Sequence, residues 1–161
     1  MLNKCTEESM TQEELKIKIP QILPEATIEE GGQWLTISFS PQQWLAAAHT
    51  LRHEESLQMD FLFCLTCIDW KTHLTMVYHL RSTNFQHNIV AKINLEIDKP
   101  EIESVAHIWR TAEFHEREVY EMFGVNFLHH PDLRLLILPD GWEEKNPLRK
   151  DFEDPVNMIK L

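Results

Sequence analysis

The residues with the most potential for chemistry lie between positions 111 and 130, where histidines and glutamates are concentrated. His115 and Glu118 would lie one turn apart on a helix, and His129 and His130 are adjacent, so either pair could supply two metal ligands. Adjacent histidines in an extended chain tend to diverge, and neither pair has further ligands at a recognisable spacing. A free metal-dependent hydrolase is therefore the minor alternative, and we expect no metal site.

Three glutamates in the same stretch, Glu116, Glu118 and Glu121, could act as a general acid and base. Clusters of glutamate and arginine on a helix more often form ion pairs. Arg117 follows Glu113 by four residues and precedes Glu121 by four, so we expect both carboxylates to share its guanidinium. The cluster is therefore interpreted as structural.

Glu118 lies on the same helical row as Phe114 and Met122. We expect its carboxylate at the edge of the core, where it must find a cation or hydrogen-bond donors, or else take up a proton.

Cys64 and Cys67 spell C-x-x-C within an apolar stretch that is typical of a strand. Residues three apart on a strand point to opposite faces, so we predict two inert thiols. The chain has no P-loop, no G-x-G-x-x-G and no four-cysteine set. We therefore expect no catalytic site and no cofactor in this chain.

A helix over 112–123 should carry the glutamate cluster. Thr111 is a candidate N-cap, and Gly124 stands where a left-handed residue commonly ends a helix.

Other elements follow from periodicity and from start and stop signals. We predict helices over 11–19, ended by Pro20, and over 41–53, and strands over 34–40, 61–68, 73–81 and 87–97. The continuous hydrophobicity of 61–68 predicts a central strand, and 100–109 fits either a helix or a strand. The order predicts an α+β fold, a mixed or mainly antiparallel sheet of about four to five strands with helices packed on it.

Residues 125–161 form an extended tail in this prediction, attached to a globular part at 1–124 within one domain. Prolines recur every eight residues, at Pro131, Pro139, Pro147 and Pro155, and exclude a long helix. Several leucines and Trp142 lie between them. Such a segment either closes over its own domain or docks on another protein.

The composition limits the kinds of partner that the chain can bind. The chain has 161 residues and a formal net charge of −11, which disfavours nucleic acid and anionic lipid. The longest nearly unbroken apolar run is about eight residues, far below the roughly 20 that span a bilayer. The first residues lack the apolar stretch of a signal peptide, so we expect a cytoplasmic protein that reaches a membrane only through partners.

Several separated blocks resemble one family, that of the 30-kDa subunit of respiratory complex I, also known as the C subunit of NADH-quinone oxidoreductase or, in plastids, the J subunit. The blocks are Glu116-Arg117-Glu118-x-Tyr120-Glu121-Met122-Phe123-Gly124, His130-Pro131-Asp132-Leu133-Arg134, Leu138-Pro139-Asp140-x-Trp142 and Pro147-Leu148-Arg149-Lys150-Asp151-Phe152. The chain departs from the usual pattern at His129 and Leu135, where the family has Gly and Arg.

The resemblance implies a structural subunit of the hydrophilic arm whose C-terminal segment docks on the neighbouring D subunit, which holds the quinone site. It assigns docking to the matching tail residues, which are Arg134, Trp142, Pro147, Leu148, Arg149, Lys150 and Asp151. The remaining signature residues would form a brace that sets the direction of the tail: Glu116, Arg117, Glu118, Tyr120 and Glu121.

By the same resemblance, NADH, FMN, iron–sulfur clusters and quinone would be held by other subunits, on the cytoplasmic face of the inner membrane. The equivalent subunit of a membrane-bound hydrogenase, or of a complex fed by another electron donor, is the alternative within the same class.

Overall fold

A computed structural model describes residues 10–29 and 31–154. The first helix, α1 (Gln12–Ile22), begins with the predicted capping box, in which Thr11 and Glu14 bond to each other's backbone N–H groups. The prediction that Pro20 ends this helix is wrong. A proline removes only one backbone N–H, and the Leu23 N–H still bonds to the Ile19 carbonyl at 2.7 Å, so the last turn closes.

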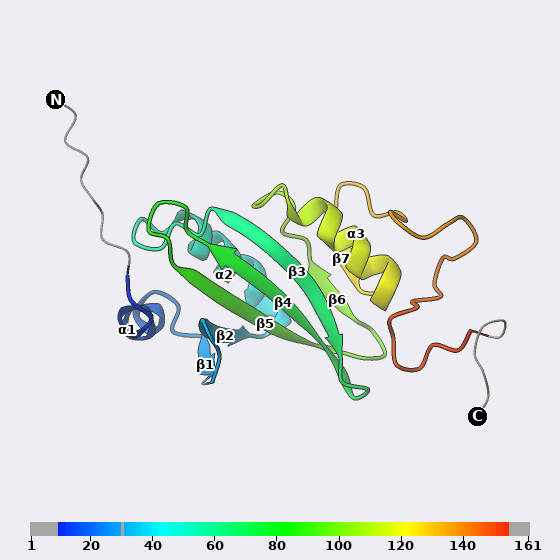
Figure 1. Ribbon diagram of the computed structural model, residues 1–161, viewed down its shortest axis with the longest axis horizontal. Coiled ribbons are helices and arrows are strands. Elements are labelled where there is room, and N and C mark those ends of the chain that lie inside the picture. The colour runs from blue at the N-terminus through cyan, green and yellow to red at the C-terminus, as the bar shows by residue number, and fades with distance from the viewer. Residues whose placement is uncertain (1–9, 30, 155–161) are drawn as a thin grey trace.

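The main sheet has five strands in the order β1-β2-β5-β4-β3 (Figure 1). Its strands are β1 (Thr27–Glu29), β2 (Leu35–Phe39), β3 (Phe61–Asp69), β4 (His73–Arg81) and β5 (Asn88–Glu96). β2 and β5 are parallel and the other neighbours are antiparallel. This confirms the α+β fold with a mixed sheet, whereas β1 was not predicted.

The strand β3 lies at the edge of the sheet, so the prediction of a central strand is wrong. Leu65 and Cys67 are buried, whereas Phe61 and Ile68 are 41% and 38% exposed. The apolar run has a different cause: α3 (Ala112–Phe123) packs along this strand beside the sheet (Figure 1).

One face of the sheet carries the core. The helix α2 (Pro41–His53) has the predicted bounds and lies behind the sheet in Figure 1. Trp44 and Leu51 of α2 are fully buried, as is Tyr78 of β4, whose ring centroid lies 4.4 Å from that of Trp44. The periodicity of 41–53 therefore identified the correct buried face.

A second, two-stranded parallel sheet pairs β6 (Glu101–Glu103) with β7 (Asn126–Leu128). Residues 100–109, for which the sequence fitted either a helix or a strand, contain the strand β6 followed by turns. The helix α3 has the predicted bounds and connects the two strands.

The tail begins within this second sheet, because β7 uses residues 126–128. Its remaining described part, 129–154, contains no helix or strand and runs along and beyond α3 (Figure 1). The predicted division at residue 124 stays a prediction. In the described part of the chain, no helix is long and apolar enough to cross a membrane.

Candidate functional site: the helix α3 and the tail

The two ends of α3 are fixed by the residues that flank it, Thr111 and Gly124. Gly124 takes a left-handed conformation, with φ of 75°, and its N–H bonds to the Tyr120 carbonyl, as predicted. Thr111 stands at the N-cap position as predicted, but its hydroxyl accepts no backbone N–H of the first turn. Its hydroxyl instead donates to the Leu62 carbonyl oxygen at 2.8 Å and attaches the start of α3 to β3.

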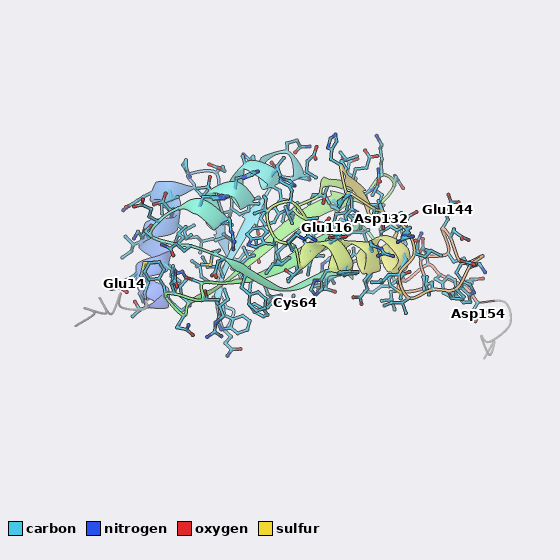
Figure 2. The ribbon with its side chains drawn as sticks, turned by 90° about the horizontal axis from the view of Figure 1, so that it is seen from above. Glu14, Cys64, Glu116, Asp132, Glu144 and Asp154 are labelled. Carbon is cyan, nitrogen blue, oxygen red and sulfur yellow. The ribbon has the colours of Figure 1, made fainter. Side chains whose placement is uncertain are left out.

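The deepest carboxylate of α3 is Glu116, which is fully buried. Its carboxylate oxygens accept hydrogen bonds from the Ser104 hydroxyl at 2.6 Å and from the Val105 N–H at 2.8 Å. Burial raises the pKa of Glu116 from 4.5 to about 7, although these two bonds act in the opposite direction. Figure 2 shows Glu116 inside the body of the protein, far from Glu144 and Asp154 in the tail.

Glu118 is exposed, so its predicted place at the edge of the core is wrong. The row that it shares with Phe114 faces outward, and Phe114 is 56% exposed. The buried carboxylates are Glu116 and Glu121 instead. The helix is covered by β3, by the β6–α3 connection and by the tail, so simple amphipathicity did not locate its buried faces.

Arg117 and Glu121 bind the tail rather than each other. The guanidinium of Arg117 donates to the carbonyl oxygens of Arg134 and Leu135 at 3.1 and 2.7 Å. The shared ion pair predicted for Glu113, Arg117 and Glu121 is therefore wrong. Arg117 is only 8% exposed, and two backbone carbonyls accept its hydrogen bonds in place of a carboxylate.

The carboxylate of Glu121 accepts the three consecutive N–H groups of residues 136–138 at distances between 2.8 and 3.2 Å. Successive N–H groups that point to one side form a natural site for an anion. The backbone of this part of the tail is therefore fixed on α3.

A second attachment lies further along the tail, at Arg149. Its guanidinium donates to the carbonyl oxygens of Phe123 and Ile97, each at 3.4 Å, and its neighbour Leu148 donates its N–H to the Met122 carbonyl at 3.1 Å. The side chain of Arg149 is 15% exposed. It therefore contacts its own domain.

Asp69 at the end of β3 completes this attachment, because its carboxylate accepts the Lys150 N–H at 2.7 Å and the Lys71 N–H at 2.6 Å. Burial alone would raise the pKa of Asp69, but these two N–H groups hold it below its usual range. The sequence placed Asp69 in a turn after an apolar strand and did not predict its contact with the tail.

The other predicted docking residues are more open. Arg134 is exposed and pairs with Asp132 at 2.9 Å. Trp142 is half-buried, with the Lys145 ammonium 4.4 Å from its ring centroid. Pro147 is half-buried, while Lys150 and Asp151 are exposed.

Tyr120, the remaining brace residue, is half-buried. It borders a cavity of about 230 Å³ between α3 and the tail, together with Glu121 and Leu135.

In the described part of the tail, up to residue 154, the large aliphatic side chains that are exposed are Leu136, Ile137 and Leu148, at 38%, 61% and 56%. Phe114 on α3 is also exposed. Large apolar side chains held outward on a fixed backbone are typical of a surface that binds another protein.

The candidate metal pairs do not assemble. His115 bonds to the Thr111 carbonyl, and its predicted companion Glu118 is exposed. His129 pairs with Glu103 at 2.8 Å while the side chain of His130 is fully buried, so the two diverge as predicted. Within residues 10–29 and 31–154, no three histidine, cysteine, aspartate or glutamate side chains form a group that could hold a metal.

The two cysteines of the C-x-x-C are free thiols, Cys67 buried and Cys64 half-buried. They lie on opposite faces of β3, as predicted. Burial raises the pKa of Cys67 to about 12, which leaves that thiol protonated.

The sequence profile of one family, described as the 30 Kd subunit of respiratory-chain NADH dehydrogenase, matches residues 37–156, which include α3 and most of the tail. The chain belongs to this family.

Relatives in the 30 Kd subunit family include the C subunit of the NADH-quinone oxidoreductase of Chloroherpeton thalassium, 39% identical over 112 residues, which cover 68% of this chain and 46% of that protein. The C/D subunit of the same enzyme in Phocaeicola vulgatus is 45% identical over 117 residues, which cover 68% of this chain and 22% of that protein. The C subunit of the F(420)H(2) dehydrogenase of Methanosarcina mazei is 41% identical over 100 residues, which cover 61% of this chain and 63% of that protein. The chain therefore spans less than half the length of the first two relatives.

Two solved structures have a similar fold. A chain of the membrane-bound sulfane sulfur reductase, an archaeal respiratory membrane complex, superposes with a TM-score of 0.77 at 24% identity, covering 88% of this chain and 85% of that one. The trypsin-resistant fragment of Nqo5 gives a TM-score of 0.64 at 22% identity, covering 76% of this chain and all of that one.

Proposed function

We propose that this 30 Kd subunit is a non-catalytic structural component of the peripheral arm of a proton-pumping NADH:quinone oxidoreductase. Its task is to hold a neighbouring subunit in position, so that electrons passed from NADH through FMN and iron–sulfur clusters reach quinone. The cofactors and the quinone are held by other subunits. The chain works on the cytoplasmic face of the membrane, which it reaches through its partners.

One observation carries the proposal: the tail has a fixed backbone and outward apolar side chains. Arg117 and Glu121 bind residues 134–138, and Arg149 of the tail binds the carbonyl oxygens of Phe123 and Ile97. Leu136, Ile137 and Leu148 are nevertheless exposed between and beside these attachments. A tail that served only to close over its own domain would bury these side chains.

The partner in this proposal is the D subunit, called the quinone-site subunit from here on. Its support is that the C/D relatives carry both subunits in one polypeptide, of which this chain matches 22% in Phocaeicola vulgatus. A fused relative keeps the two parts at high effective concentration, which is typical of partners that bind each other. Arg134 is exposed and Trp142 is half-buried, and both are assigned to the same contact.

A second candidate is the equivalent subunit of a complex that uses another electron donor. The observation that favours it is the 41% identity to the F(420)H(2) dehydrogenase relative. The docking role is the same in both candidates, so only the accompanying electron-input subunits differ.

Recovery of the quinone-site subunit with the affinity-tagged full chain from membranes tests the docking role. The variant Leu136→Ser/Ile137→Ser removes two exposed aliphatic side chains while keeping the backbone attachments of the tail. Burial of such side chains contributes ~1.5–3 kcal/mol each, so we expect recovery of the quinone-site subunit to fall at least about tenfold. The proteins recovered with the wild-type chain also separate the candidates, because flavin subunits that oxidise NADH accompany only the first.

Ile17→Ser is the matched control, since Ile17 is 67% exposed and lies on α1, at the opposite end of the molecule from the tail (Figure 1). It should leave recovery of the quinone-site subunit unchanged. Equal recovery with the wild-type and double-variant chains would contradict docking through Leu136 and Ile137.

A further inference from the structure

Near the start of the tail lies a buried pair of side chains whose chemistry the proposed function does not use. Glu116 on α3 and His130, two residues after β7, both have fully buried side chains, and the Nε2 atom of His130 lies 3.8 Å from a carboxylate oxygen of Glu116. That separation is too long for a hydrogen bond, which joins such atoms at about 2.7–3.2 Å.

The hydrogen bonds of His130 define its protonation. The Asp132 N–H donates to Nδ1 at 3.0 Å, so Nδ1 is an acceptor and carries no proton. Nε2 lies 3.0 Å from the Glu113 carbonyl oxygen, which only accepts, so Nε2 carries the proton and donates it. His130 is therefore neutral and offers no positive charge to Glu116.

No other group supplies that charge. Arg117, on the same helix, directs its guanidinium to tail carbonyls, and Ser104 and Val105 offer neutral donors. Tyr78 of β4 interacts electrostatically with Glu116, but burial raises the pKa of Tyr78 well above 10, so it stays neutral. Among the described residues, no lysine or arginine forms an ion pair with Glu116.

We propose that His130 is a two-acceptor switch: its Nε2–H donates to the Glu113 carbonyl while Glu116 holds a proton, and turns to the Glu116 carboxylate when that proton leaves. The arrangement seen, with 3.0 Å to Glu113 and 3.8 Å to Glu116, is the one expected for the protonated carboxyl. In that state the O–H of Glu116 donates to the Ser104 hydroxyl oxygen 2.6 Å away, whereas the ionised carboxylate accepts from the same hydroxyl. A charge-assisted bond has a length of about 2.8 Å, so the imidazole would move by roughly 1 Å.

This movement reaches the tail directly. Pro131 follows His130 with a fixed φ, and the Asp132 N–H is bonded to the same imidazole, so both are displaced with the ring. The attachments at Arg117 and Glu121 lie a few residues further on. Because burial places the pKa of Glu116 at about 7, the exchange of acceptors occurs near neutral pH.

The proton site itself does not depend on the partner, whereas its influence on docking rests on the proposed function. NMR on the isolated full chain therefore tests the switch separately. The carboxyl ¹³C signal of Glu116 should titrate with a midpoint near pH 7 rather than 4.5. The Nε2–H proton of His130 should shift downfield with the same midpoint, while the ¹⁵N signal of Nδ1 stays that of an unprotonated nitrogen.

Glu116→Gln should abolish the shift at His130, because the amide stays neutral. Glu113→Gln is the control and should keep it, since Glu113 contributes only its backbone carbonyl. A Glu116 midpoint near 4.5, protonation of Nδ1 in this range, or a shift that survives in Glu116→Gln would each overturn the switch. If Glu116→Gln does not fold, the test of the switch depends on two wild-type measurements, the titration midpoint of the Glu116 carboxyl and the ¹⁵N signal of Nδ1 of His130.

The influence on docking has its own readout, the recovery of the quinone-site subunit at pH 6 and pH 8. A change of several-fold in the wild-type chain that disappears in Glu116→Gln supports it. Equal recovery at both pH values overturns the link to docking. Failure to recover the quinone-site subunit at either pH contradicts the proposed function instead.

Discussion

Glu121 and Ile137 are joined by hydrogen bonds from the Ile137 N–H to both oxygens of the Glu121 carboxylate, at 3.0 and 3.2 Å. Leu136 and Leu138 add their N–H groups to the same carboxylate. The helix α3 thereby sets the course of a segment that has no regular structure of its own. The side chain of Ile137, whose N–H is at the centre of this arrangement, is left 61% exposed.

Glu121→Gln should loosen this section of the tail. A glutamine keeps the shape but offers one accepting oxygen and no charge to the three N–H groups, so we expect a loss of about 1–3 kcal/mol in the free energy of unfolding. Faster amide exchange at residues 136–138 would report the local effect. Glu118→Gln is the matched control, because Glu118 is exposed on the same helix and should leave both quantities unchanged.

Arg149→Ala should release the later section of the tail. It removes the donors to the Phe123 and Ile97 carbonyls, and limited proteolysis should then cleave after residue 140 several times faster. Arg134→Ala removes a guanidinium that is exposed and pairs with Asp132, so it serves as the control. Unchanged cleavage in Arg149→Ala would mean that the backbone bonds of Leu148 and Lys150 hold the tail without it.

Elements with local signals were predicted well from the sequence. The capping box at Thr11 and the left-handed Gly124 each depend on residues within one turn, and α2 begins at the predicted Pro41. Long-range pairing was harder. β1 and β7 have three residues each, too few to show a period. β3 was predicted to be central because its sequence is continuously apolar, but it is an edge strand, and the helix α3 covers it where a neighbouring strand was expected.

The site was predicted in outline only. The sequence singled out α3 and the tail, but it could not show that Arg117 and Glu121 bind the backbone of the tail, since carbonyl and N–H groups are the same at every residue. Glu118 was selected as buried because a helical row was taken as the guide. Glu116 is buried instead because Ser104 and Val105, in the connection that precedes α3, pack against it and donate hydrogen bonds to its carboxylate.

Gly124→Ala should destabilise the junction between α3 and β7. Its φ of 75° is costly for a residue with a Cβ, and that Cβ would lie 2.7 Å from the side-chain nitrogen of Asn146. We expect thermal unfolding to show a loss of ~1–2 kcal/mol. Gly141→Ala is an informative comparison, because Gly141 also has a positive φ, of 85°, but has no atom within 4 Å of the added Cβ. A smaller loss of stability in Gly141→Ala would show that the contact with Asn146 adds to the cost of backbone strain at Gly124.

The stability of the protein should depend on pH through Glu116. Its pKa is about 7 in the folded chain and 4.5 when solvated, so between these values the folded state holds a proton that the unfolded state has lost. The free energy of unfolding therefore falls as pH rises through this window, by up to about 1.36 kcal/mol per pH unit and by roughly 3 kcal/mol in total.

Two histidines oppose this trend. Burial lowers the pKa of His79 and His87 below 6.5, so their contribution rises with pH up to that value. The difference in the free energy of unfolding between the wild-type chain and Glu116→Gln removes the contributions of both histidines, so it reports Glu116 alone. Chemical unfolding at pH 5 and pH 8 should show Glu116→Gln gaining about 2–3 kcal/mol relative to the wild type over this interval. A constant difference between the two chains would mean that Glu116 is ionised throughout, and that the hydrogen bonds from Ser104 and Val105 outweigh its burial.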